Sequence, residues 1–172
     1  MTAQEFKLPY LNTREENVLR FLGLPTIMRA TGESTRGAYG LVEHPAVPPG
    51  FASPYHVHHR EDEAFYILEG EVEFVFDGKW HTAGAGAYVF GPREIPHGFR
   101  VAGNRPAQML ILASPAGFES FVLELSEPIA APPSPGPPDM QKLVATAAKY
   151  GIDILGPLPE KKLSSGGTIE KA

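Results

Sequence analysis

The sequence predicts an all-β fold made of short strands joined by tight turns. Proline and glycine number 18 each among the 172 residues, and such frequent interruption of short apolar runs favours strands with many turns. The run 71–76 alternates so that one face carries only apolar side chains, as in a strand with one buried face. Asp77-Gly78 follows directly and is a favoured two-residue hairpin turn. This combination is typical of a barrel or a sandwich.

Length, charge and composition narrow the class of protein. A chain of 172 residues predicts one domain that can bury a core. The net charge of −5 and a pI of 5.7 argue against a nucleic acid or an anionic membrane as partner. No apolar run approaches the ~20 residues of a membrane span, and the first residues lack a secretion signal, so we expect a cytoplasmic protein. Cysteine is absent, which excludes disulfides and thiolate metal ligands.

The first 49 residues predict a strand, a turn-rich segment and a loop. A capping-box pattern at 13–16 would start a short helix, but Gly23 and Pro25 end the pattern too early for a stable one. The alternation over 18–22 therefore favours a strand. Further strands are predicted over 27–30 and 37–43, followed by a proline-rich loop.

Beyond residue 70, strands are predicted over 71–76, 79–82, 87–90, 97–102 and 108–113. The spacing within 118–125 is helical, and the six prolines of 126–138 indicate an extended connector. Asp139 is a candidate N-cap for a helix over 140–150, with Gly151 as its stop. On this helix Met140, Leu143, Val144 and Ala147 share the predicted apolar face, and Ile152, Ile154 and Leu155 should pack back on the strands. From residue 159 the polar tail is predicted to be disordered.

A candidate metal site surrounds the stretch 50–70. His56 and His58 are two residues apart, so a strand places both imidazoles on one face. After a polar bend over 59–62, Glu63 opens a second apolar strand, and a chain that doubles back brings its carboxylate beside the imidazoles. His97, after a Gly-Pro turn, is a fourth candidate ligand. Imidazole and carboxylate are donors suited to Zn, Fe, Ni, Cu or Mn.

The same residues carry a family resemblance. The pattern G-x5-H-x-H-x4-E-x6-G is matched at every fixed position, and G-x5-P-x-G-x2-H-x3-N is matched at its first glycine, its proline and its histidine. The matching residues are Gly50, His56, His58, Glu63 and Gly70, and then Gly86, Pro92 and His97. Glu94 and Val101 depart from the second pattern, where the family usually has Gly and Asn. With these motifs the chain resembles the cupin superfamily, and most of all single-domain cupins of the quercetin-dioxygenase-like type, which also share the Pro-Ala-Gly-Phe-Glu segment 115–119.

The resemblance implies a cupin, jelly-roll-like β-barrel over 26–114 with a small C-terminal helical extension over 115–158. Residues 1–25 would be an N-terminal arm or strand, and 159–172 a disordered tail. It further implies one divalent transition metal held by His56, His58, Glu63 and His97, with Glu63 also acting as the catalytic base.

The activity implied is that of a metal-dependent dioxygenase acting with O2 on an enolic or phenolic, flavonol-like substrate. Two alternatives stay open: a non-redox isomerase or lyase that uses the metal as a Lewis acid, and a non-catalytic small-molecule-binding cupin. Relatives commonly pair, so a homodimer is expected, with the strand over 18–22 as the edge that seeks a partner.

Strand parity separates the remaining candidates into pocket and surface. Phe65 lies on the side of Glu63, and Phe99 on the side of His97, so both are expected in the substrate-pocket wall. Surface positions are predicted for three histidines and for the two acidic residues of the bend; these are His44, His59, His81, Glu61 and Asp62.

Overall fold

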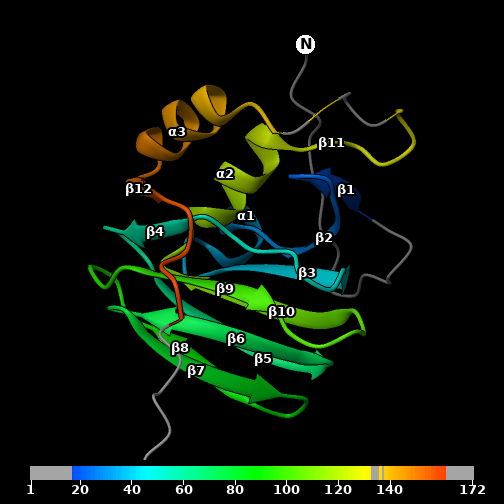
Figure 1. The fold of residues 1–172 in the computed structure, drawn as a ribbon. Helices are drawn as coiled ribbons and strands as arrows, with labels where there is room; N and C mark the ends of the chain where they lie inside the picture. The colour runs from blue at the N-terminus through cyan, green and yellow to red at the C-terminus, as the bar shows by residue number, and fades with distance from the viewer. Residues whose placement is uncertain (1–16, 133–135, 137, 162–172) are drawn as a thin grey trace, which may run out of the picture.

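Two antiparallel sheets form the body of the protein (Figure 1). The computed structural model describes residues 17–132, 136 and 138–161. The strands are β1 (Val18–Phe21), β2 (Leu24–Ala30), β3 (Gly40–Val47), β4 (Tyr55–His58), β5 (Asp62–Glu69), β6 (Glu71–Phe76), β7 (Lys79–Gly84), β8 (Tyr88–Gly91), β9 (His97–Val101), β10 (Ala107–Ser114), β11 (Glu127–Pro128) and β12 (Ile152–Gly156). The helices are α1 (Gly32–Thr35), α2 (Phe118–Leu125) and α3 (Met140–Lys149). One sheet has the order β11-β1-β2-β3-β10-β5-β8 and the other the order β12-β4-β9-β6-β7, so the predicted all-β class is confirmed.

The core lies between the sheets and follows the predicted alternation. Phe65 and Ile67 of β5 face inward beside Ile111 and Met109 of β10, because the register pairs Phe65 with Ile111 and Ile67 with Met109. Phe74 of β6 is also fully buried and packs against Phe65, with ring centroids 5.0 Å apart. Each fully buried side chain of this size contributes ~1.5–3 kcal/mol to the stability of the fold.

The turn between β6 and β7 has the conformation that its sequence predicts. Asp77 has φ 47° and Gly78 has φ 75°, and two successive left-handed residues define the turn that matches the twist of a hairpin. The pairing of Phe76 with Lys79 places this turn at the end of the ladder.

At the N-terminal side the strand interpretation is confirmed, but its expected role is not. β1 pairs with β2 on one edge and with β11 on the other. The pairing with β11 involves Leu19 and Arg20, so the role of this strand in a homodimer, like the homodimer itself, stays a prediction. The capping-box pattern at 13–16 lies outside the described residues. β3 extends to Val47 and includes Pro45, which was predicted to lie in the proline-rich loop.

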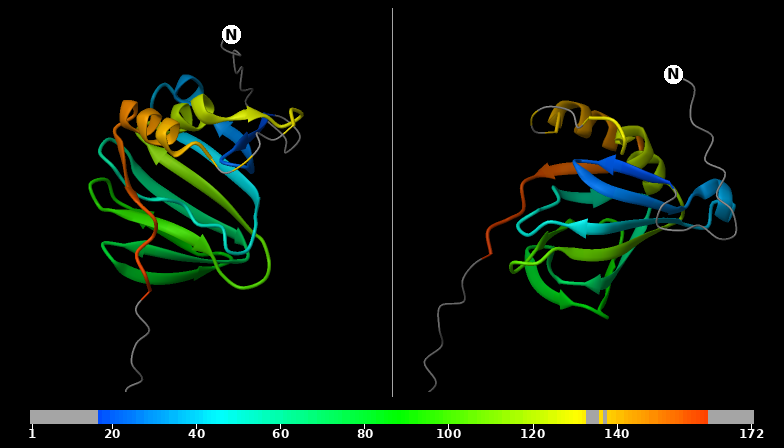
Figure 2. Two further views of the ribbon diagram at one scale, coloured as in Figure 1. Left: turned by 45° about the horizontal axis from the view of Figure 1, so that its top comes forward. Right: turned by 90° about the vertical axis from the view of Figure 1, so that its right-hand side faces the viewer.

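The C-terminal elements close one end of the molecule. α2 and α3 lie together at the end away from β7 and β8 (Figure 1). The Asp139 side chain accepts hydrogen bonds from the backbone N–H groups of Gln141 and Lys142, as predicted for an N-cap. After α3, β12 runs back along the strands, in orange to red in Figure 2, and pairs with β4 so that Ile152 lies opposite His58.

The buried face of α3 differs from the predicted one. Leu143 and Ala147 are buried, but Met140 and Val144 are 50% and 45% exposed. Leu155, expected to pack inward, is 53% exposed. Among the described elements, α3 packs mainly against α2 and β12. These two neighbours cover only a narrow stripe of the helix, whereas its apolar pattern predicts a broad buried face.

The tail predicted from residue 159 lies mostly outside the described residues. Within the described part, Lys161 forms an ion pair with Glu73 of β6. No described helix combines the length and the apolar character needed to cross a membrane.

Replacing Leu143 tests how α3 packs against the rest of the protein. We expect Leu143→Ala to lower the free energy of unfolding by about 2–5 kcal/mol, since a buried leucine is truncated. Val144→Ala is the matched control, because the neighbouring side chain is half exposed and should change stability by no more than ~0.5 kcal/mol. Urea denaturation of both variants measures the difference, and equal stabilities would contradict the described packing.

Candidate metal centre

Four predicted ligands meet between the two sheets. His56 and His58 lie on β4 and His97 on β9 of the five-stranded sheet, where His56 is the register partner of His97. Glu63 comes from β5 of the facing sheet. One ligand atom from each residue lies within 4.8 Å of the others, and only His56 is less than fully buried. The structure thus brings all four residues to one point.

The three imidazoles are held by their outer nitrogens. The Nδ1–H of His56 donates to the Pro54 carbonyl at 2.8 Å, and that of His97 donates to the Ile95 carbonyl at 2.8 Å. Because a carbonyl only accepts, each of these nitrogens carries the hydrogen. The Nδ1 of His58 lies 3.4 Å from a carboxylate oxygen of Glu61. Each Nε2 is then left for the centre of the cluster.

The inner nitrogens fit a metal ion. The Nε2 of His58 is buried without a hydrogen-bond partner, and its distance to the nearer Glu63 oxygen is 3.7 Å. An unsatisfied buried nitrogen is costly and calls for a partner. The Nε2 of His97 lies 2.9 Å from the other Glu63 oxygen. Three imidazoles and one carboxylate are a donor set for a divalent transition metal, so the residues present fit such an ion.

Electrostatics sets the charge states of the residues in the cluster. Burial, then the neighbouring His97 and His58, lower the pKa of His56 to about 3. Burial alone would raise the pKa of Glu63, but His58, His97 and His56 outweigh it and lower that pKa to about 2. Burial opposes the charge on His97, but the hydrogen bond that its ring donates to the Glu63 carboxylate and the charge of Glu63 together outweigh burial and raise the pKa of His97. At neutral pH Glu63 is therefore anionic and His56 is neutral, and these are the forms that bind metals.

An apolar cavity opens beside the cluster. It offers about 70 Å³ to the centres of water molecules. Phe65 and Phe99 line it, where strand parity places them, and Phe118 and Phe121 of α2 add further aromatic wall. Leu143 of α3 also lines the cavity, so the C-terminal extension builds part of the pocket.

His44 also lines this cavity, so its predicted surface position is wrong. It is 3% exposed, and its Nδ1 lies 3.1 Å from the Thr26 hydroxyl. Burial lowers the pKa of His44 to about 4. The alternation of β3, which turns Val42 and His44 to the same face, is the sequence signal that could have indicated this position.

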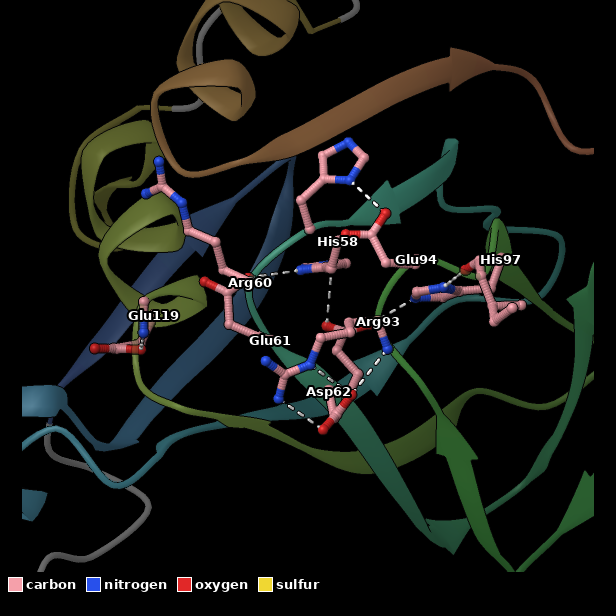
Figure 3. A network of polar contacts seen from close by, with 12 residues as sticks. His58, Arg60, Glu61, Asp62, Arg93, Glu94, His97 and Glu119 are labelled. Atoms are coloured by element: carbon pink, nitrogen blue, oxygen red, sulfur yellow. Dashed lines mark hydrogen bonds and ion pairs between the residues drawn. The ribbon is translucent and has the colours of Figure 1, made fainter.

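The two acidic residues of the bend, both predicted at the surface, lie in different environments. Glu61, expected in solvent, is 2% exposed and lies against His58. Asp62 is at the surface as expected and pairs with Arg93 at 2.8 Å, which lowers the pKa of Asp62 to about 2. Figure 3 shows the two carboxylates diverging, one toward His58 and the other toward Arg93.

The remaining histidines are exposed as predicted. His81 lies in solvent. His59 lies between Asp153 and Glu94, at 3.0 and 2.8 Å, and the hydrogen bonds to these carboxylates raise its pKa. Glu94 has φ 66°, so it adopts the left-handed conformation for which the family pattern uses glycine.

Comparisons with known proteins agree with this architecture. Residues 45–113 match the family model of the cupin domain. An uncharacterized protein of Methanocaldococcus jannaschii is 28% identical over 107 residues, which are 62% of this chain and 79% of that protein. The dimethylsulfoniopropionate lyase DddQ of Ruegeria pomeroyi is 39% identical over 67 residues, which are 38% of this chain; the chain thus spans about a third, 32%, of that enzyme.

Among solved structures, an RmlC-like cupin of Shewanella frigidimarina superposes with a TM-score of 0.55 at 21% identity. The match covers 65% of this chain and 96% of that one, and at this identity it bears on the fold alone. Together with the domain match over residues 45–113, this fold supports placing the chain in the cupin superfamily.

Proposed function

We propose that this protein is a metal-dependent dioxygenase that acts on a small enolic or phenolic compound. The supporting observation is the cluster of His56, His58, Glu63 and His97, whose ligand atoms lie within 4.8 Å of one another at the wall of an apolar cavity. A divalent metal held there would bind an acidic substrate oxygen as its anion and leave positions for further ligands.

Glu63 is the group proposed to take the substrate proton. Its carboxylate is buried in the cluster and lines the cavity, so a hydroxyl that reaches the cluster is within its range. The aromatic walls at Phe65 and Phe99 would orient a flat substrate and keep water out. In the overall reaction O2 is the oxidant, two C–O bonds form, and the O–O bond and a carbon–carbon bond break. The substrate supplies all four electrons, so no external reductant is needed.

The polarity of the cavity bears on the class of substrate. Apart from the cluster, the polar side chains that the described structure places in the lining are His44 and Ser53. A sugar would require more hydrogen-bonding partners than these, which argues against a sugar isomerase.

A second candidate is a lyase that needs no O2. The 39% identity to dimethylsulfoniopropionate lyase DddQ over 67 residues supports it. In this reaction Glu63 would remove a proton from substrate carbon, and a leaving group would depart with the electron pair. The same residues serve both candidates, so the requirement for O2 separates them.

Metal content is the first prediction. Protein purified without a histidine tag should bind close to one transition metal per chain after reconstitution, and His97→Ala should abolish most of this binding. His81→Ala is the matched control, because His81 lies in solvent and its loss should leave the metal in place. Elemental analysis measures both, and negligible metal in the wild-type chain would contradict the proposal.

The reaction class is the second prediction. With small enols and phenols, the metal-loaded protein should consume O2 in an oxygen electrode in proportion to product formed. Turnover of a candidate substrate at an unchanged rate under anaerobic conditions would instead establish the lyase. A loaded protein that binds such compounds without turning them over by either route would be a binding cupin.

The third prediction concerns Glu63. Glu63→Gln keeps the shape and an oxygen donor but cannot accept a proton at neutral pH. We expect metal affinity to fall about 10- to 100-fold, by analogy with the loss of supports around metal sites. Turnover per bound metal should fall further, by about 10²–10⁴-fold, the usual contribution of a positioned base. Wild-type turnover per metal would show that another group takes the proton.

A further inference from the structure

Glu61 is a buried acidic residue that lies against a candidate metal ligand. The residue is 2% exposed, and in the described part of the chain its hydrogen-bond partner is the imidazole of His58. The neighbouring Asp62 provides the contrast, since it lies at the surface and has Arg93 as its ion-pair partner. A carboxylate removed from water without a compensating charge costs several kcal/mol. The position of Glu61 therefore calls for positive charge close by: that of Arg93, whose pKa is raised first by Asp62 and also by Glu61, and a further charge on the side of His58.

The contact with His58 directs that charge to the metal centre. The Nδ1 of His58 lies 3.4 Å from Glu61 Oε2, and both side chains are buried (Figure 3). A carboxylate accepts, so the ring donates from Nδ1, and the lone pair of Nε2 is left on the side of Glu63. This Nε2 is the buried atom that has no hydrogen-bond partner.

His58 is supported differently from the other two imidazoles. His56 and His97 each donate to a backbone carbonyl two residues earlier in the chain. These carbonyls carry no net charge and are present whatever the side chain is. His58 depends on a side chain three residues later, and that side chain brings a full negative charge.

The surrounding structure keeps Glu61 in this position. A Cβ placed on Gly117 would lie 2.4 Å from Glu61 Oε1, so the carboxylate fits against a position that has no side chain. The next residue, Phe118, packs edge-on against His58 with ring centroids 5.6 Å apart. The start of α2 thus encloses both the carboxylate and the imidazole that it supports.

We propose that Glu61 is a positioning residue of the metal centre. It fixes the His58 tautomer that presents Nε2 to the ion, and with Glu63 it supplies two negative charges against the two positive charges of a divalent metal. This inference rests on the metal binding proposed above, but it concerns a residue outside the ligand set.

Zinc affinity of the full chain tests the proposal. We compare wild type, Glu61→Gln and Glu61→Ala by competition with a chromophoric chelator. Glu61→Ala should bind zinc about 10- to 100-fold more weakly, the usual effect of removing a partner of a metal-bound histidine. Glu61→Gln is nearly isosteric, and its amide oxygen still accepts the Nδ1–H, so its loss should be smaller and reflect the charge alone. Asp62→Asn is the matched control, since it removes the same charge one residue away at the surface, and it should bind within about twofold of wild type.

Proton NMR of the cobalt-loaded chains provides a readout that a merely structural role would not change. Wild type should show three exchangeable, strongly shifted N–H resonances, one from each Nδ1–H. In Glu61→Ala the resonance of His58 should disappear through exchange with water, while those of His56 and His97 persist. Zinc affinities and three resonances like those of wild type in both Glu61 variants would overturn the proposal, as would an equal loss in Asp62→Asn. If wild type itself binds neither zinc nor cobalt, the metal centre fails as well; if wild type binds normally and the Glu61 variants match it, this inference alone fails.

Discussion

Burial of three imidazoles and a carboxylate at one point is the constraint on which the rest of this structure depends. Each polar atom removed from water needs a partner, and the fold provides partners for both the outer and the inner nitrogens of the imidazoles. The outer nitrogens of His56 and His97 find the backbone carbonyls of Pro54 and Ile95, because both carbonyls lie just before a strand and outside the sheet ladder. The inner nitrogens converge on Glu63, which only the facing sheet can supply. The two-sheet architecture is thus what allows a polar cluster to exist inside an apolar core.

The closure of the cavity follows from the same constraint. Sheets alone would leave the cluster open at one end, where α2 and α3 now lie. Phe118 touches the ring of His58, and Leu143 closes the apolar wall further out. An electrostatic interaction is stronger where water is excluded, so the helical extension contributes to the chemistry of the site without providing a ligand. A shared fold says little about the reaction, and the composition of this wall is more informative than the topology.

The sequence correctly predicted the features that depend on interactions between residues close together in the chain. Parity on a strand placed His56 and His58 together, the Asp77-Gly78 pair predicted its hairpin, and Asp139 predicted the start of α3. The predictions that failed depend on contacts between distant segments. Glu61 is buried only because the turn at Gly117, 56 residues later, leaves room for it. His44 is inward, where its Nδ1 lies 3.1 Å from the hydroxyl of Thr26 on the neighbouring strand. Val144 is exposed because α3 has few neighbouring elements in the described structure. β1 is not at the edge of its sheet because β11, which begins at residue 127, pairs with it.

The pairing of β12 with β4 has a consequence for synthesis of the chain. Ile152 lies opposite His58, so 94 residues must be added after the histidine strand before its last neighbour exists. At ribosomal speeds of about 5–20 residues per second, this takes on the order of 5–20 s. Throughout that interval the outer edge of β4 is unpaired, and an unpaired edge is where strands of other chains attach. The nascent protein therefore carries His56 and His58 on an open strand until β12 has left the ribosome.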